Sequence, residues 1–168
     1  SGQSDVYCRF YVYMTDYPDN VVKFARLNFS GGAHEGWYLN HYWTPGGYVP
    51  FLGVGTPAGG IDRFDGYAGA GFTALLNQWV SLEIEYNRDL DGANQGGFRC
   101  WVNGTLYTGA FTPAGGATLD GSGWIHFNTT FSQTVTGWWF CDTYNDSHSR
   151  YPVFYYDRVA VSTQRIGP

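Results

Sequence analysis

Charged side chains are scarce in this sequence. Asp, Glu, Lys and Arg together make up 14% of the chain, against about 25% in an average globular domain. Lys23 is the only lysine, the net charge at pH 7 is −5, and no run of basic residues occurs. Nucleic acids and anionic membrane surfaces are bound through clustered Lys and Arg. We therefore expect neither as a partner.

Long apolar runs and strong helix formers are scarce as well. No apolar stretch approaches the roughly 18 residues of a transmembrane helix, so we expect no membrane insertion. Ala, Leu, Glu and Lys are too few for a coiled coil or a helical bundle. The three cysteines, Cys8, Cys100 and Cys141, lack Cys-x-x-Cys spacing, which argues against a zinc site.

Aromatic residues and glycine are abundant. Phe, Trp and Tyr form 20% of the 168 residues, and there are 24 glycines. Disordered chains are poor in aromatic side chains, so the composition indicates a folded protein. Its length suits one domain over residues 1–168, large enough to bury a core. We expect that domain to be a monomer.

Hydrophobic residues alternate with polar ones at a period of two, which is typical of half-buried strands. In residues 6–14 one face reads Val, Cys, Phe, Val and Met. Two further alternating segments, residues 79–86 and 98–103, flank the loop 87–97. Further strands are expected over 22–29, 37–43, 124–130, 136–142 and 153–162, and one helical turn over 74–77. Many short strands without alternating helices predict an all-β fold, an antiparallel two-sheet β-sandwich.

Cys8 and Cys100 both occupy expected core faces. A disulfide between them requires neighbouring strands, because the two Cα atoms must lie within about 7 Å of each other. Three separate buried thiols are the alternative.

The polar face of the first strand carries aromatic rings and arginine together. Aromatic rings stack on the C–H faces of sugars, and arginine donates directed hydrogen bonds to their oxygens. We therefore interpret this face as a polysaccharide-binding surface, with the burial of these aromatics under long loops as the alternative. Asn40, Tyr42 and Asn128 would extend two of its rows. The candidate ligand-binding residues are Tyr7, Arg9, Tyr11, Tyr13, Tyr38, Arg99, Trp101, Trp124 and His126.

Three segments resemble a known superfamily: DVYCRFYVYM, QWVSLEIEYNRDLDGANQGGFRCWVNGTLY and FYYDRVAVSTQRIG. They are similar to the concanavalin A-like lectins and glucanases, and more narrowly to its secreted, polysaccharide-lyase-like jelly rolls. The resemblance implies a jelly-roll fold, a polysaccharide partner and secretion. It also implies a structural calcium ion near Asp157. The superfamily holds binding modules and enzymes alike, so it does not fix an activity.

Two enzyme chemistries are conceivable. Glu83 and Glu85 share a strand face, as the two carboxylates of a retaining glycosidase would, but solvated or arginine-paired carboxylates are the favoured reading. A lyase acting on a uronate needs a Tyr or His base and a cation that neutralises the sugar carboxylate. Its candidates are Tyr11, Tyr13, His126, Arg9 and Arg99. Because no complete catalytic motif occurs, we expect first a carbohydrate-binding or lectin-like domain, then a polysaccharide lyase, then a structural or adhesin domain.

The loop 87–92 has the spacing of a calcium loop. Asn87, Asp89 and Asp91 stand at its first, third and fifth positions, and Gly92 stands at the sixth. Oxygen ligands at this spacing bind calcium, although Phe98 replaces the glutamate that usually completes such a loop. An acidic hairpin turn is the alternative.

Overall fold

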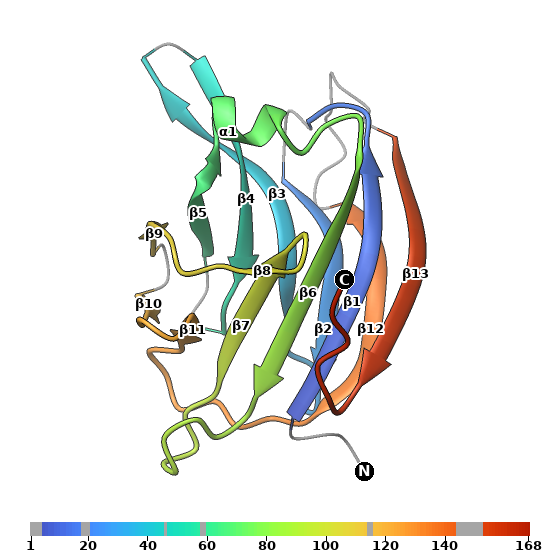
Figure 1. Ribbon diagram of the computed structural model, residues 1–168. Coiled ribbons are helices and arrows are strands. Elements are labelled where there is room, and N and C mark those ends of the chain that lie inside the picture. Colours follow the sequence, from blue (N-terminus) through green and yellow to red (C-terminus); the bar gives the residue numbers. More distant parts are fainter. Residues whose placement is uncertain (1–4, 18–20, 46, 58–59, 114–115, 144–152) are drawn as a thin grey trace.

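Two antiparallel β-sheets face each other in the computed structural model (Figure 1). One sheet has seven strands in the order β10-β11-β7-β6-β1-β13, with β8 paired to β7. The other has six, in the order β12-β2-β3-β4-β5-β9. The structure describes residues 5–17, 21–45, 47–57, 60–113, 116–143 and 153–168, with only the backbone of residues 24, 40–43, 48 and 141–143. The predicted antiparallel β-sandwich is confirmed.

The first strands and the short helix precede the central hairpin. Their bounds are β1 (Asp5–Met14), β2 (Val22–Phe29), β3 (His34–Thr44), β4 (Gly47–Gly55), β5 (Ile61–Ala68) and α1 (Ala70–Thr73). The hairpin and the remaining strands are β6 (Trp79–Asn87), β7 (Gly97–Val102), β8 (Thr105–Leu106), β9 (Phe111–Thr112), β10 (Thr118–Leu119), β11 (Trp124–His126), β12 (Val135–Thr143) and β13 (Phe154–Ser162).

The core lies between the two sheets and is rich in aromatic rings. Strand β1 alternates between half-buried and buried side chains along its whole length, and Phe10 and Val12 are fully buried. On the opposite sheet Trp37 and Phe64 are also fully buried, with ring centroids 5.6 Å apart. The period-two pattern thus produces one apolar layer, because each strand turns its apolar face toward the other sheet.

The single helical turn precedes its expected position. Helix α1 ends at Thr73, whereas the sequence suggested residues 74–77. Leu75 is 2% exposed and packs into the core. The backbone N–H of Asn77 donates to the Met14 carbonyl, and Asn77 has a φ of 56°. The helix cannot continue through this segment, because Asn77 adopts a left-handed conformation and its N–H is bonded to the end of β1.

Of the two alternatives for Cys8 and Cys100, the structure has separate buried thiols and no bridge between them. Both cysteines are buried and free. Ile84 on β6 pairs with Cys8 on one side and with Cys100 on the other, so the two cysteines are separated by a whole strand. Burial raises the pKa of both thiols. The side chain of Cys141 is outside the described part of the chain.

In the described part of the chain, no helix has the length and apolar character needed to cross a membrane.

Candidate functional site

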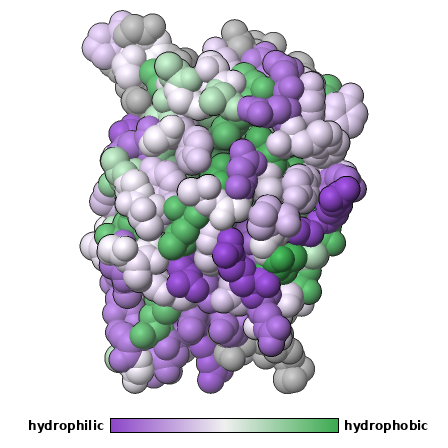
Figure 2. All heavy atoms as spheres, viewed as in Figure 1, coloured by the Kyte–Doolittle hydropathy of each residue, from purple (hydrophilic) through white to green (hydrophobic). Residues whose placement is uncertain are grey.

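The outer face of the seven-stranded sheet, here called the Arg9 face, carries most of the side chains proposed to bind glycan. Tyr7, Arg9, Tyr11 and Tyr13 all point away from the core, as their alternation predicted. Strand β11 lies beside β7, so Trp124 pairs with Arg99 and joins the same surface. His126 and Trp101 are also on these strands. Figure 2 shows hydrophilic residues on this side of the molecule interspersed with separate apolar ones.

The charges of the Arg9 face are already paired within the protein. Glu85 is 3% exposed. Its carboxylate accepts a hydrogen bond of 2.5 Å from the Tyr7 hydroxyl and lies 2.6 Å from the Arg99 guanidinium. Burial, together with the hydrogen bond to Glu85, raises the pKa of Tyr7 to about 12. Arg99 therefore neutralises an internal carboxylate, which favours the arginine-paired reading for Glu85.

The C-terminal segment covers the middle of the Arg9 face. In Figure 1 it turns back from the lower end of β13 and runs over β1 and β6. The Gly167 carbonyl accepts a 2.6 Å hydrogen bond from Arg9, and the Ile166 N–H donates to Glu83 at 2.9 Å. Arg165 lies over the Trp101 ring at 5.0 Å.

Trp101 was expected at an open surface, and this expectation is wrong. The ring is 4% exposed because the C-terminal segment lies against it.

The row of the glycan surface that was expected to contain Tyr38, Asn40 and Tyr42 lies on the other sheet. Tyr38 is on β3, where it pairs with Lys23 of β2 and Gly53 of β4. It cannot join Arg9, because the two outer faces are on opposite sides of the sandwich. The side chains of Asn40 and Tyr42 are outside the described residues.

The lyase candidates chosen from the sequence are not assembled into one constellation. His126 is on β11 and Tyr11 on β1, with β7 and β6 between them. The His126 ring lies 2.8 Å from the Asp120 carboxylate, which also accepts a hydrogen bond from Ser122. The His126 contact holds the pKa of Asp120 well below its usual range.

A second polar surface lies on the outer face of the six-stranded sheet. We call it the Lys23 face and define it by Lys23, Arg26, His34, Glu35, Tyr38 and Trp139. A β-bulge at residue 24 shifts the pairing of β2 with β3. Because one extra residue is inserted, Lys23 and Arg26 both point outward although they are three residues apart. Simple alternation places these two cations on opposite faces, which is why sequence reasoning missed this cluster.

Glycine makes room for an acidic group on the Lys23 face. A Cβ atom on Gly55 would lie 2.5 Å from Glu35 Oε2 and 2.7 Å from Tyr38 Cε2. The Glu35 carboxyl and the Tyr38 ring therefore fill the space above Gly55. The Tyr38 hydroxyl donates to Glu35 Oε2 at 3.5 Å.

The environment of Glu35 makes it titrate near neutral pH. Burial, with a smaller contribution from the Asp62 charge, raises the pKa of Glu35 to about 7. Lys23, Tyr38 and Arg26 act in the opposite direction but do not offset the loss of water. A carboxyl with this pKa can both accept and donate a proton near pH 7.

Cations and aromatic rings surround Glu35. The Lys23 ammonium lies 3.4 Å from His34 Nε2 and 5.7 Å from the Tyr38 ring centre. Arg26 lies over the Trp139 ring at 4.5 Å. Lys23 and Arg26 are 8% and 7% exposed, whereas Trp139 is 52% exposed. The cations thus form the floor of the surface, and the indole stands at its rim.

The calcium loop gains no support from the arrangement of its side chains. Asp89 and Asp91 direct carboxylate oxygens to backbone N–H groups of Asn94 and Ala93, as in a hydrogen-bonded hairpin turn. Asp157 has Arg158 as its neighbouring charge. Among the described residues, no group of three or more His, Cys, Asp or Glu could hold a metal ion. Calcium binding stays a prediction.

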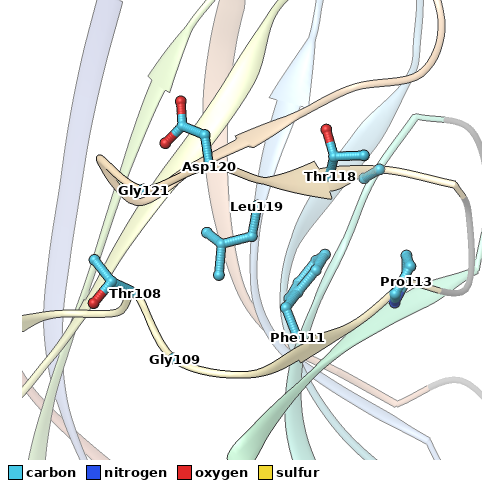
Figure 3. A pocket seen from close by; sticks show the side chains of 9 residues that line it. Thr108, Gly109, Phe111, Pro113, Thr118, Leu119, Asp120 and Gly121 are labelled. Carbon is cyan, nitrogen blue, oxygen red and sulfur yellow. The ribbon is translucent and has the colours of Figure 1, made fainter.

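A cavity of about 460 Å³ lies near β9 and β10, at the edge of the sandwich. Figure 3 shows Leu119 and Phe111 entering the space between their two segments, while the Asp120 carboxylate points away. The lining also includes Thr108 and Thr118, and the cavity contains none of the residues of the Lys23 face. We assign it no role.

Comparison with solved structures identifies the fold. A double mutant of alginate lyase Aly36B in complex with alginate trisaccharide superposes with a TM-score of 0.62 at 11% identity, over 98% of this chain and 73% of that one. The chain shares the β-sandwich fold of alginate lyases. Alginate lyase PA1167 from Pseudomonas aeruginosa gives a TM-score of 0.57 at 12% identity, over 96% and 66% of the two chains. No protein-family model and no curated protein matches the sequence.

The alginate lyase fold agrees with the concanavalin A-like, polysaccharide-lyase-like resemblance of the sequence. At this level of identity it establishes the architecture, and function depends on the site.

Proposed function

We propose that this protein binds an acidic, uronate-bearing polysaccharide on the Lys23 face. The supporting observation is that two cations, Lys23 and Arg26, lie with the half-exposed Trp139 indole on one face of an otherwise acidic, lysine-poor chain. A solved neighbour with the same fold was crystallised with alginate trisaccharide, and alginate is a polymer of uronates.

Each part of the face suits one part of a uronate chain. The exposed Trp139 ring offers an apolar surface for the C–H side of a sugar, and Arg26 lies over that ring at 4.5 Å. Guanidinium and ammonium groups bind carboxylates through charge-assisted hydrogen bonds. His34 adds ring nitrogens that can contact hydroxyl groups, whereas Tyr38 is 4% exposed and lies beneath the surface. The Arg9 face supports this function less well, since the C-terminal segment covers Trp101, which is 4% exposed, whereas Trp139 is 52% exposed.

The test compares binding to alginate and to the neutral polymer dextran, using affinity electrophoresis of the full chain. Lys23→Met removes one cation of the face, and Arg88→Met removes an exposed cation from the hairpin loop as a matched control. A charge-assisted hydrogen bond contributes about 1.5–3 kcal/mol. Lys23→Met should therefore weaken alginate binding roughly tenfold to a hundredfold, with no such change in Arg88→Met. Equal losses in the two variants, or no loss in Lys23→Met, would contradict the proposal.

Cleavage of the bound chain by β-elimination is a second candidate function, favoured by the contact between Glu35 and Tyr38. In this reaction a base removes the proton from C5, next to the carboxylate. The C4–C5 double bond forms as the C4–O4 bond breaks, and an acid protonates O4. The cations would neutralise the sugar carboxylate, and Glu35 and Tyr38 would move the protons.

Absorbance of the unsaturated product distinguishes an enzyme from a binding protein. If the protein is a lyase, absorbance rises during incubation with alginate, and Tyr38→Phe abolishes the rise while alginate still binds. A protein that binds alginate without any rise is a binding module.

A further inference from the structure

Three aromatic rings form an exposed row at one end of the Arg9 face, away from the C-terminal segment. Tyr13 on β1 pairs directly with Trp79 on β6 and with Tyr155 on β13. The Tyr13 ring centre lies 5.8 Å from that of Trp79 and 6.1 Å from that of Tyr155. Trp79 is 48% exposed and Tyr155 is 55% exposed. The row runs across the strands, at the upper end of β6 and β13 in Figure 1.

Polar groups flank this aromatic row on the neighbouring rung of the sheet. Tyr11 pairs with Ser81 on β6 and with Asp157 on β13. The side chains of Asp157 and Arg158 are 60% and 72% exposed. Arg158 lies over the Tyr11 ring at 5.8 Å. Flat apolar rings beside exposed hydrogen-bonding groups match the alternation of C–H faces and hydroxyl groups on a pyranose chain.

The dimensions of the row favour a narrow ligand. Adjacent strands lie about 4.8 Å apart, so three strands give a row long enough for about two sugar rings. A stable protein interface buries roughly 800 Å² on each partner. On the side of the molecule shown in Figure 2, apolar residues form separate spots rather than a continuous patch. A narrow aromatic row in polar surroundings fits a polysaccharide better than a second protein.

We propose that Tyr13, Trp79 and Tyr155 form a second glycan site, which stacks about two pyranose rings of a polysaccharide chain. The site lies on the opposite side of the sandwich from the Lys23 face and does not depend on the function proposed there. It holds its ligand by ring stacking. It should therefore accept neutral and acidic sugars alike, and its affinity should change little with salt, in contrast to an ion-paired site.

Two indole N–H groups report on the two faces separately in one experiment. The ¹⁵N-labelled full chain is titrated with cellohexaose and, separately, with alginate hexasaccharide. The Trp79 and Trp139 cross-peaks are identified by their loss in Trp79→Phe and Trp139→Phe. We expect saturable shifts of the Trp79 peak with both oligosaccharides, at low and at tenfold higher sodium chloride. Tyr155→Ala should weaken that binding at least about fivefold, and Trp139→Ala should leave it unchanged.

Three results would overturn the second site. The Trp79 peak could remain still with both oligosaccharides, or Tyr155→Ala could leave its titration unaltered. It could also shift on protein dilution alone, which would assign the row to contacts between copies of the chain. Failure of the function proposed for the Lys23 face would appear elsewhere, as a Trp139 peak that does not respond to alginate hexasaccharide.

Discussion

Replacing Glu35 by glutamine should change how the stability of the protein depends on pH. The pKa of this carboxyl is raised from an ordinary 4.5 to about 7, mainly because burial disfavours its charged form. Between these values the native protein holds a proton that the unfolded chain has released. The protonated carboxyl therefore contributes stability below about pH 4.5, and this contribution is lost as the pH rises through 7.

The size of the effect follows from the difference between the two pKa values. Each pH unit corresponds to 1.36 kcal/mol, so a shift of roughly 2.5 units amounts to about 3 kcal/mol. Glutamine stays neutral at every pH. The free energy of unfolding of Glu35→Gln, relative to the original protein, should thus increase by up to about 3 kcal/mol between pH 4.5 and pH 8.

Urea unfolding of both proteins, followed by tryptophan fluorescence at several pH values, measures this difference. The titration of all other groups cancels in the comparison, apart from the groups that contact Glu35. A constant difference between the two proteins from pH 4.5 to 8 would refute the assignment of a raised pKa to Glu35.

Four further predictions concern the fold. Trp101→Ala should reduce the free energy of unfolding by about 3–5 kcal/mol in urea, as for other buried tryptophans; a variant as stable as the original would mean that the C-terminal segment does not cover the ring. Gly55→Ala forces Glu35 and Tyr38 aside and should cost about 1–3 kcal/mol, whereas Gly121→Ala, with no heavy atom within 4 Å of its added Cβ, should unfold like the original. Alkylation in denaturant without reductant, mapped by mass spectrometry, should modify both Cys8 and Cys100, and protection of this pair would contradict the strand order. Finally, calcium binding at the acidic hairpin loop should raise the melting temperature. At a hundredfold excess of calcium over the dissociation constant, the free energy of unfolding should increase by roughly 2.7 kcal/mol. A melting curve that EDTA leaves unchanged would show that the loop does not bind calcium.

The architecture could be predicted because one signal governs it. Alternation in β1 and in the hairpin β6–β7 places Val6 and Ile84 inside and Tyr7 outside, and the structure has them there. Alternation does not predict which of the two sheets a strand joins. Tyr38 has the same pattern as Tyr7, yet it belongs to the opposite sheet, because strand order depends on contacts far apart in sequence.

The candidate site was harder to predict than the fold. A bulge changes which residues share a face, and nothing in the residue types around position 24 marks it. The raised pKa of Glu35 arises mainly from burial that only the folded chain creates, and its carboxyl occupies space left by the glycine at position 55, twenty residues away. Trp101 is likewise buried by a segment distant in sequence, which includes Arg165.

The position of β1 between β6 and β13 has a consequence for how the protein is made. On one side β1 pairs with a strand about seventy residues later, and on the other side with a strand that begins at Phe154. During synthesis β1 emerges long before either partner, and one of its edges stays unpaired until β13 has also left the ribosome. Such distant pairing slows folding, and an apolar strand with a free edge is prone to associate with other chains. Truncations that remove β13 should therefore aggregate during expression even when every residue of the Lys23 face is retained.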